Sequence, residues 1–168
     1  MSHADLITLP RLFARLPHLL GNLPGILKGL HIGSRSRGQR PGGLGLCVEQ
    51  AAARNPDGLA LIQDEHQLSY AEFNQWANRL AHYLQAQGLR KGDSVALMLE
   101  NRLELLACVT ACAKLGAVSA LISSSQRGQV LAHSITLVKP KLALVGEELL
   151  ESFLEVEAQL GLPANARL

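Results

Sequence analysis

Between residues 68 and 122 the chain alternates two helical patterns with two short apolar runs, and each boundary carries its own signal. Ser69 followed by Glu72 forms a capping box, because the hydroxyl accepts a free amide of the first helical turn while the carboxylate reaches back. A helix is therefore predicted to begin at Tyr70. Apolar residues then recur at three- and four-residue steps until Gly88, which suits a left-handed helix end, so this helix should end near Gln87.

The pattern continues on both sides of this helix. Residues 94–99 form a predicted strand, Asn101 and Glu104 repeat the capping signal for a second helix that Gly116 closes, and residues 118–122 form the next strand. Upstream, a helix is predicted over 46–54, a turn over 55–58, and a hairpin from 59–63 to 67–69. Downstream, a helix is predicted over 129–138, a strand over 141–145 and a helix over 147–160.

This order predicts an α/β fold in which parallel strands are connected by helices on both faces. We therefore expect a partial, doubly wound, mainly parallel sheet with helices on both faces, preceded by an amphipathic helical leader. Residues 105–122 are nearly all apolar, but Lys114 and Gly116 divide them into a helix and a strand, which argues against a membrane span.

Three stretches resemble a known family in their order and spacing: LSYAEFNQWANRLAHYL, GLRKGDSVALMLENRLELL and AKLGAV. They resemble the start of the large domain of the adenylate-forming, or AMP-binding, enzymes, a group that contains the acyl-CoA synthetases. The stretch SALISSSQRGQVLAHSI looks most like the long-chain and very-long-chain branch, also called fatty acid transport proteins. That branch usually has asparagines near the positions of Ser123 and Ser125, and then a leucine-arginine pair of which Gln126 replaces the leucine and Arg127 is kept. The resemblance covers about residues 44–145.

The resemblance implies that the intact family member is a ligase that joins a fatty acid to CoA. ATP and magnesium first activate the carboxylate as an acyl-adenylate, and the CoA thiol then displaces AMP. This sequence lacks the Ser/Thr/Gly-rich loop ending in Lys that would hold the triphosphate, and the family's catalytic lysine belongs to a later domain. We therefore expect an N-terminal fragment, inactive by itself, with no catalytic, cofactor-binding or metal residue of its own.

The net charge of the chain differs on the two sides of Gly45. The net charge is only +2, which argues against nucleic-acid binding. However, residues 1–45 carry +5 and the remainder carries −3. We expect a basic amphipathic leader over 1–32, a flexible linker over 33–45, and the incomplete N-terminal portion of the large AMP-binding domain over 46–168.

The leader combines leucines, prolines at seven-residue spacing and basic residues. Such a segment suits a membrane interface, with apolar side chains in the acyl region and cations near the phosphates. The predicted contacts are Arg11, Leu12, Phe13, Arg15, Leu19, Leu20 and Lys28. This hypothesis places the protein in the cytoplasm, peripheral at the inner membrane face. Docking of the leader on the protein itself and a cleaved targeting peptide are the alternatives.

Few residues invite a chemical role. Ser123, Ser124, Ser125 and Arg127 follow the end of a predicted strand, where open α/β sheets place their ligands, so they are candidates for a ligand loop; helix capping and loop solvation are the alternative. Cys108 and Cys112 share one helical face and are predicted to be buried free thiols. The six histidines form no HxxH or HExxH pattern.

Two other classes of function remain open. The chain is then either a non-catalytic module that binds a membrane surface or a protein partner, or part of another adenylating enzyme that activates an amino acid or an aryl acid. The sequence leaves the acyl length and the oligomeric state open.

Overall fold

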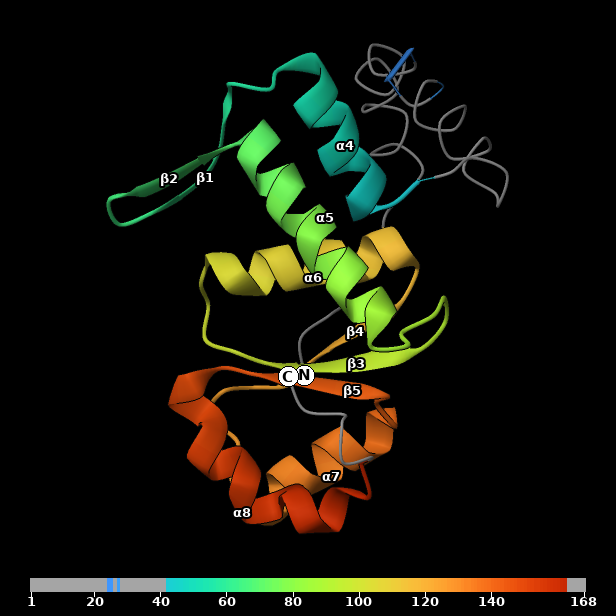
Figure 1. The fold of residues 1–168 in the computed structure, drawn as a ribbon, viewed down its shortest axis with the longest axis vertical. Coiled ribbons are helices and arrows are strands. Elements are labelled where there is room, and N and C mark those ends of the chain that lie inside the picture. Colours follow the sequence, from blue (N-terminus) through green and yellow to red (C-terminus); the bar gives the residue numbers. More distant parts are fainter. Residues whose placement is uncertain (1–23, 26, 28–41, 163–168) are drawn as a thin grey trace, which may run out of the picture. The chain divides into compact units, whose positions relative to one another are not determined.

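The computed structural model describes residues 24, 25, 27 and 42–162. Residues 24, 25 and 27 are helical and exposed. All the predicted membrane contacts in the leader lie outside the described residues. Residues 42–162 form the following elements (Figure 1): α4 (Leu44–Arg54), β1 (Leu59–Gln63), β2 (His66–Ser69), α5 (Tyr70–Ala86), β3 (Ser94–Met98), α6 (Leu103–Leu115), β4 (Val118–Leu121), α7 (Gly128–Val138), β5 (Leu142–Val145), the 3-10 turn η1 (Glu147–Leu149) and α8 (Leu150–Leu160).

The strand β3 is the centre of a parallel sheet with the order β4-β3-β5. Val95 of β3 is paired with Ser119 of β4 on one side and with Leu142 of β5 on the other, and both registers continue in step. A helix separates each of these strands from the next along the chain, which confirms the predicted α/β alternation. The hairpin β1–β2 is a separate antiparallel pair, as predicted.

Helices cover both faces of this sheet. Figure 1 shows α5 and α6 on one side of the strands and α7 and α8 on the other. The side chains of β3 alternate accordingly: Val95 and Leu97 belong to the apolar cluster with α5 and α6, whereas Ala96 and Met98 belong to the cluster with α7 and α8. A strand that is buried on both faces has a continuous apolar run in its sequence, and residues 95–99 form such a run.

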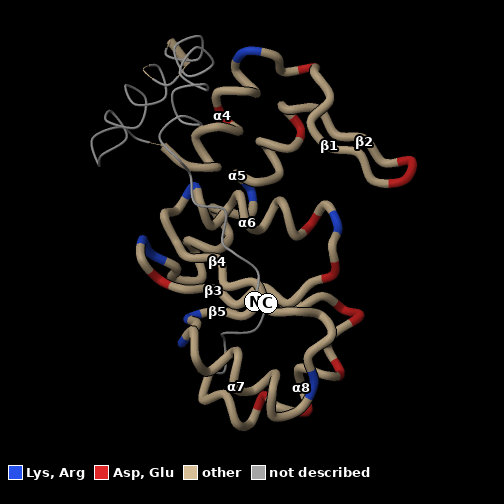
Figure 2. Tube along the Cα trace, turned by 180° about the vertical axis from the view of Figure 1, so that it is seen from behind, with Lys and Arg blue, Asp and Glu red and all other residues tan. Residues whose placement is uncertain are grey.

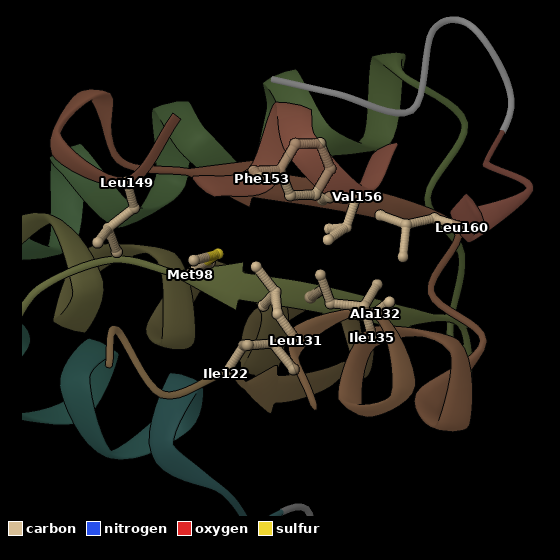
Figure 3. Close-up of a cluster of buried hydrophobic side chains, with 11 residues drawn as sticks. Met98, Ile122, Leu131, Ala132, Ile135, Leu149, Phe153, Val156 and Leu160 are labelled. Atoms are coloured by element: carbon tan, nitrogen blue, oxygen red, sulfur yellow. The ribbon is translucent and has the colours of Figure 1, made fainter. Parts of the chain in front are cut away.

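The core under α7 and α8 is built around Phe153, whose side chain is fully buried. Figure 3 shows Phe153 and Val156 of α8 facing Leu131 and Ile135 of α7. The side chain of Met98, at the end of β3, belongs to the same cluster. Each large apolar side chain buried in this way stabilises the fold by about 1.5–3 kcal/mol relative to an exposed one.

The helix α5 begins as predicted, at a complete capping box. The Ser69 hydroxyl accepts from the Glu72 backbone N–H at 3.2 Å, and the Glu72 carboxylate accepts from the Ser69 N–H at 2.8 Å. The Ser69 backbone N–H, and to a smaller extent the Ser69 side chain, lower the pKa of the Glu72 carboxyl. The hydrogen bonds that cap the amino end of α5 thus join residues only three positions apart, and the sequence alone is enough to locate this end of the helix.

The start of α6 was predicted wrongly. Its N-cap is Arg102, and no side chain caps it locally, so Asn101 does not act as the cap. The side-chain oxygen of Gln63, at the end of β1, accepts from the Leu103 N–H at 2.9 Å instead. The other end agrees with the prediction, because Gly116 adopts the left-handed conformation that ends the helix.

A close crossing and a buried ammonium connect α4 to the other helices. A Cβ on Gly45 would lie 2.9 Å from the Cγ and 3.0 Å from the backbone N of Lys114, so a larger residue would require the two helices to move apart. The Lys114 side chain is 6% exposed, and its Nζ donates to Glu49 of α4 at 2.6 Å and to Asn74 of α5 at 2.9 Å. This charge is therefore a structural link between three helices.

Two other predicted helices also differ from the structure by more than one residue. The helix predicted over 46–54 begins at Leu44, so the last two residues of the predicted linker are helical. The helix predicted over 147–160 is split into η1 and α8, because Leu149 N bonds to Gly146 O in a 3-10 turn. Residues 105–122 are divided between α6 and β4 as predicted. Among the helices of the described ranges, none combines the length and the apolarity needed to cross a bilayer.

Candidate functional site

The carboxyl ends of β3, β4 and β5 form the candidate site. The connection after β3 leads to α6 on one face of the sheet, whereas the connections after β4 and β5 lead to helices on the other face. Neighbouring strands whose connections diverge in this way leave a crevice at their carboxyl ends, and open α/β sheets bind ligands there. The residues that follow Met98, Leu121 and Val145 are therefore the first to consider.

The loop after β4 contains the predicted ligand residues and brings them together. The hydroxyl oxygens of Ser123 and Ser125 lie 2.9 Å apart, and Gln126 N donates to Ser123 O to close a turn. The Arg127 guanidinium donates to the carbonyls of Ser124 and Gln126 at 2.6 and 2.7 Å. The loop is thus held in one shape by its own groups, while Ser123, Ser125 and Arg127 remain exposed.

The loops after β3 and β5 are joined by one carboxylate, that of Glu148. Its Oε1 accepts from the Glu100 backbone N–H at 3.1 Å, and its Oε2 accepts from the Arg102 guanidinium at 2.9 Å. Burial raises the pKa of Glu148, but hydrogen bonds from its own backbone and from Glu100, together with Arg102, outweigh burial and leave the pKa below its usual value. The side of the crevice between β3 and β5 is therefore occupied by an ionised side chain of the protein.

Gly146 makes this arrangement possible. A Cβ on Gly146 would lie within van der Waals overlap of the Glu148 carboxylate, so a larger residue would displace it. Gly146 N also donates to Met98 O at 2.8 Å, which extends the β3–β5 pairing by one step. The glycine and the carboxylate together fix how the two loops meet.

A hollow lies between the β1–β2 hairpin and the start of α6. It has a volume of about 360 Å³, and Leu68, Trp76 and Leu103 form its apolar part. Arg102 borders it, and the Arg102 Nε atom is buried and lies 3.6 Å from a Glu104 oxygen, without a hydrogen bond. The arrangement offers an apolar surface with one fixed cation at its rim.

Charged side chains at the opposite, amino ends of the strands serve the fold. Lys141 Nζ donates to Asp93 at 2.8 Å and to the carbonyl of Gly88 at 2.8 Å. The Lys141 hydrogen bond, followed by that from the Arg90 N–H, lowers the pKa of the Asp93 carboxyl. Figure 2 shows that the three parallel strands themselves carry no charged residue. Around this sheet, the charged residues thus lie in the connections and the helices.

The cysteines and histidines of the described residues form no reactive cluster. Cys108 and Cys112 are buried and unpaired, as predicted, while Cys47 is free and exposed. Burial, with a smaller effect of Cys112, raises the pKa of Cys108 to about 11, and burial also raises that of Cys112, so both are thiols at neutral pH. Within residues 24, 25, 27 and 42–162, no group of three His, Cys, Asp or Glu side chains is placed to hold a metal ion.

Sequence reasoning found the loop after β4 but missed the ion pair of Arg102 and Glu148. These residues are 46 positions apart, and each lies in a segment with several other charged residues. The available signal was positional, since both follow the end of a buried apolar run.

The fold is that of a doubly wound α/β protein with a parallel sheet covered by helices on both faces. Residues 48–166 match the family model described as AMP-binding enzyme. The chain therefore belongs to the AMP-binding enzyme family.

Individual relatives are similar over most of this chain. It is 33% identical over 150 residues to the medium/long-chain-fatty-acid–CoA ligase FadD6 of Mycobacterium tuberculosis, covering 89% of this chain and 25% of the relative. It is 32% identical to the long-chain fatty acid transport protein 1 of Mus musculus, covering 74% of this chain and 20% of that protein. The inhibitor-bound N-terminal domain of FACL13 from Mycobacterium tuberculosis has a similar structure, with a TM-score of 0.68, 28% identity and coverage of 73% of this chain and 31% of that one. The chain thus spans about a quarter of the length of the ligase it matches.

Proposed function

We propose that this chain is the N-terminal part of the large domain of an ATP-dependent fatty acid:CoA ligase. The observation that carries the proposal is the similarity to a fatty acid–CoA ligase over 89% of the chain, together with the α/β fold of residues 42–162. In the intact protein the reaction would form an acyl-adenylate from the fatty acid and ATP, with magnesium, and then an acyl-CoA. ATP, magnesium, CoA and the fatty acid are thus the proposed cofactors and substrates of the intact protein.

The described residues do not by themselves fit a triphosphate. The loop after β4 carries one cation, Arg127, and its guanidinium is already bonded to carbonyls of the same loop. Arg102, after β3, is bonded to Glu148. A triphosphate needs several amide or cationic donors that converge on it. We therefore propose that the chain alone is inactive and that no side chain of it performs a step of the reaction.

The part that this chain would play is to shape one wall of the ligand crevice. We propose that Ser123, Ser124, Ser125 and Arg127 contact ligand in the intact domain. Two facts support this role: the loop follows the carboxyl end of β4, and it is held in one conformation by its own hydrogen bonds. A preformed polar loop loses little conformational freedom when a ligand binds.

A chimera tests the proposed reaction. Residues 48–166 of this chain would replace the matching segment of the FadD6 ligase, and formation of acyl-CoA from a long-chain fatty acid, ATP and CoA would be measured. We expect the chimera to retain ATP-dependent ligation. A second chimera with Arg127→Gln tests the contribution of the loop. If the loop contacts ligand, this substitution should change KM or kcat while the helical content stays the same.

The chimera also decides between the alternatives. A folded chimera, with the far-ultraviolet circular dichroism of the parent enzyme, that forms no acyl-CoA contradicts the fatty acid ligase function. A chimera that activates an amino acid or an aryl acid instead favours another adenylating enzyme. Binding of the isolated chain to a protein partner, without any contribution to ligation in the chimera, favours a non-catalytic module.

We further propose that the leader holds the protein at the cytoplasmic face of the membrane as a peripheral contact. Its support is chemical: residues 1–45 carry a net charge of +5 and leucine-rich segments. Flotation with vesicles that contain anionic lipid tests this. The full chain should float and a variant with Arg11, Arg15 and Lys28 replaced by Gln should not. Equal flotation of both proteins, or none of either, contradicts the membrane contact.

A further inference from the structure

The strand β4 is an open edge of the parallel sheet. Within residues 42–162, β4 pairs with β3 on one of its sides only, and no described strand lies beyond β4. Two of its apolar side chains are largely exposed, Val118 at 55% and Leu121 at 62%. At the other edge of the same sheet, Leu142 and Ala143 of β5 are buried, at 2% and 1%. The two edges are thus built differently.

The β4 edge also lacks the features that normally prevent pairing between sheets. Residues 117–126 contain no charged residue and no proline. The β5 edge is bracketed by Pro140 and Lys141 before it and by Glu147 and Glu148 after it. Proline and charge are the usual means by which edge strands avoid adding another strand, because one removes a donor and the other resists burial. By this criterion β5 is protected and β4 is not.

The backbone of β4 is free to pair on its outer side. Val118 N donates to Asp93 O and Ile122 N donates to Leu97 O, so the amides at these positions point toward β3. Because amides alternate along a strand, those of Ser119 and Leu121 point to the open side. A strand that docks there would meet donors and acceptors at these two residues.

These positions are self-complementary. Ser119 and Leu121 lie on the same face of the sheet, since their partners in β3 are Val95 and Leu97. An antiparallel second copy with a twofold axis at Ala120 would set Ser119 opposite the other copy's Leu121. Both members of each such pair direct their amide and carbonyl outward, which is the requirement for a hydrogen-bonded antiparallel pair. Side chains placed opposite each other would also lie on the same face.

We propose that β4 is a self-association edge, at which a second copy of this chain adds its own β4 in antiparallel orientation. An unlike partner is usually selected by complementary charges, and this edge carries none to select one. A second copy, by contrast, brings the matching uncharged edge automatically, and no like charges meet across the twofold axis. The strand has four residues, so the contact is small and the association depends on concentration.

Sedimentation equilibrium of the 168-residue chain tests this proposal, over about a hundredfold range of concentration. We expect the average mass to rise from 18.1 kDa toward twice that value. Leu121→Lys should keep the mass at 18.1 kDa. The lysine would lie beside Ser119 of the second copy, and the new strand pair would cover part of its charged side chain. Val118→Lys, on the other face of the same strand, should act in the same way.

The matched control is Ile62→Lys, which replaces an apolar side chain that is 59% exposed on the separate hairpin. It should associate like the unchanged chain. All the substituted side chains are exposed, and unchanged circular dichroism confirms that each variant is folded. A mass that stays at 18.1 kDa for the unchanged chain overturns the proposal. Association that survives both β4 variants, or that Ile62→Lys abolishes equally, overturns it as well.

Discussion

The substitution Phe153→Ala tests whether α8 belongs to the core that covers one face of the parallel sheet. The Phe153 side chain is fully buried, and its neighbours Leu131 and Ile135 on α7 are also buried, at 0% and 1% exposed. Removing a buried aromatic ring loses its transfer free energy and leaves a cavity, which together cost about 3–5 kcal/mol. Domains of this size have a free energy of unfolding of about 5–15 kcal/mol, so the variant should still fold.

Urea unfolding measures this loss. With a slope of about 1–3 kcal/mol per molar urea, a loss of about 3 kcal/mol lowers the midpoint by about 1–3 M. Circular dichroism would report the helices, and the fluorescence of Trp76, the single tryptophan, would report the other side of the sheet. Both signals should shift together, because β3 contributes to the cores on both faces.

Leu154→Ala is the matched control, since this neighbour on the same helix is 45% exposed. Its free energy of unfolding should change by no more than about 0.5 kcal/mol, so its midpoint should stay close to that of the unchanged chain. Equal losses for the two variants would refute the placement of α8. A shift in circular dichroism without a shift in Trp76 fluorescence would refute the single cooperative core.

Four further predictions follow from individual contacts. Gly45→Ala should destabilise the fold by about 1–3 kcal/mol in thermal or urea unfolding, because its Cβ would press on the Lys114 backbone. Alanine favours helices more than glycine does, so unchanged or higher stability would contradict the close crossing. Ser69→Ala should cost about 1 kcal/mol in the same assay through loss of the α5 cap, and a neutral result would contradict the capping box. The pKa of Glu148 is lowered in the folded state, so its contribution to stability is complete above the usual value of 4.5 and is lost as the pH falls through the folded value. Glu148→Gln should therefore weaken the acid dependence of the free energy of unfolding. An identical pH profile would argue against the ion pair. A thiol reagent should react at once with exposed Cys47 and with the two buried thiols only in denaturant, and rapid reaction of all three would contradict their burial.

Features that depend on neighbouring residues in the sequence were predictable. The α5 cap involves Ser69 and Glu72, three residues apart, and Gly116 ends α6 by its own conformation. The alternation of helices and apolar runs was enough to predict a parallel sheet covered on both faces. The position of the loop after β4 followed from the same order, although its role in ligand binding stays a prediction.

Features that depend on distant residues were not predictable. The start of α6 is capped by Gln63, 40 positions earlier, which no local capping signal can reveal. The 3-10 turn before α8 accompanies the contact of Glu148 with Glu100 and Arg102, which only the folded sheet brings together. The helix α4 begins at Leu44, two residues before its predicted start, and this first turn contains the approach of Gly45 to Lys114. In each case the structure contains a contact between residues far apart in the sequence, which a local sequence pattern does not reveal.

Under the proposed function, this chain supplies structural elements of a fatty acid:CoA ligase but not its reacting groups. The most direct test is an assay of the purified 168-residue chain with a long-chain fatty acid, ATP, magnesium and CoA, beside the intact FadD6 ligase as the positive control. We predict acyl-CoA formation by the control and none by the chain. Thioester formation by the chain that requires both ATP and CoA would contradict the claim.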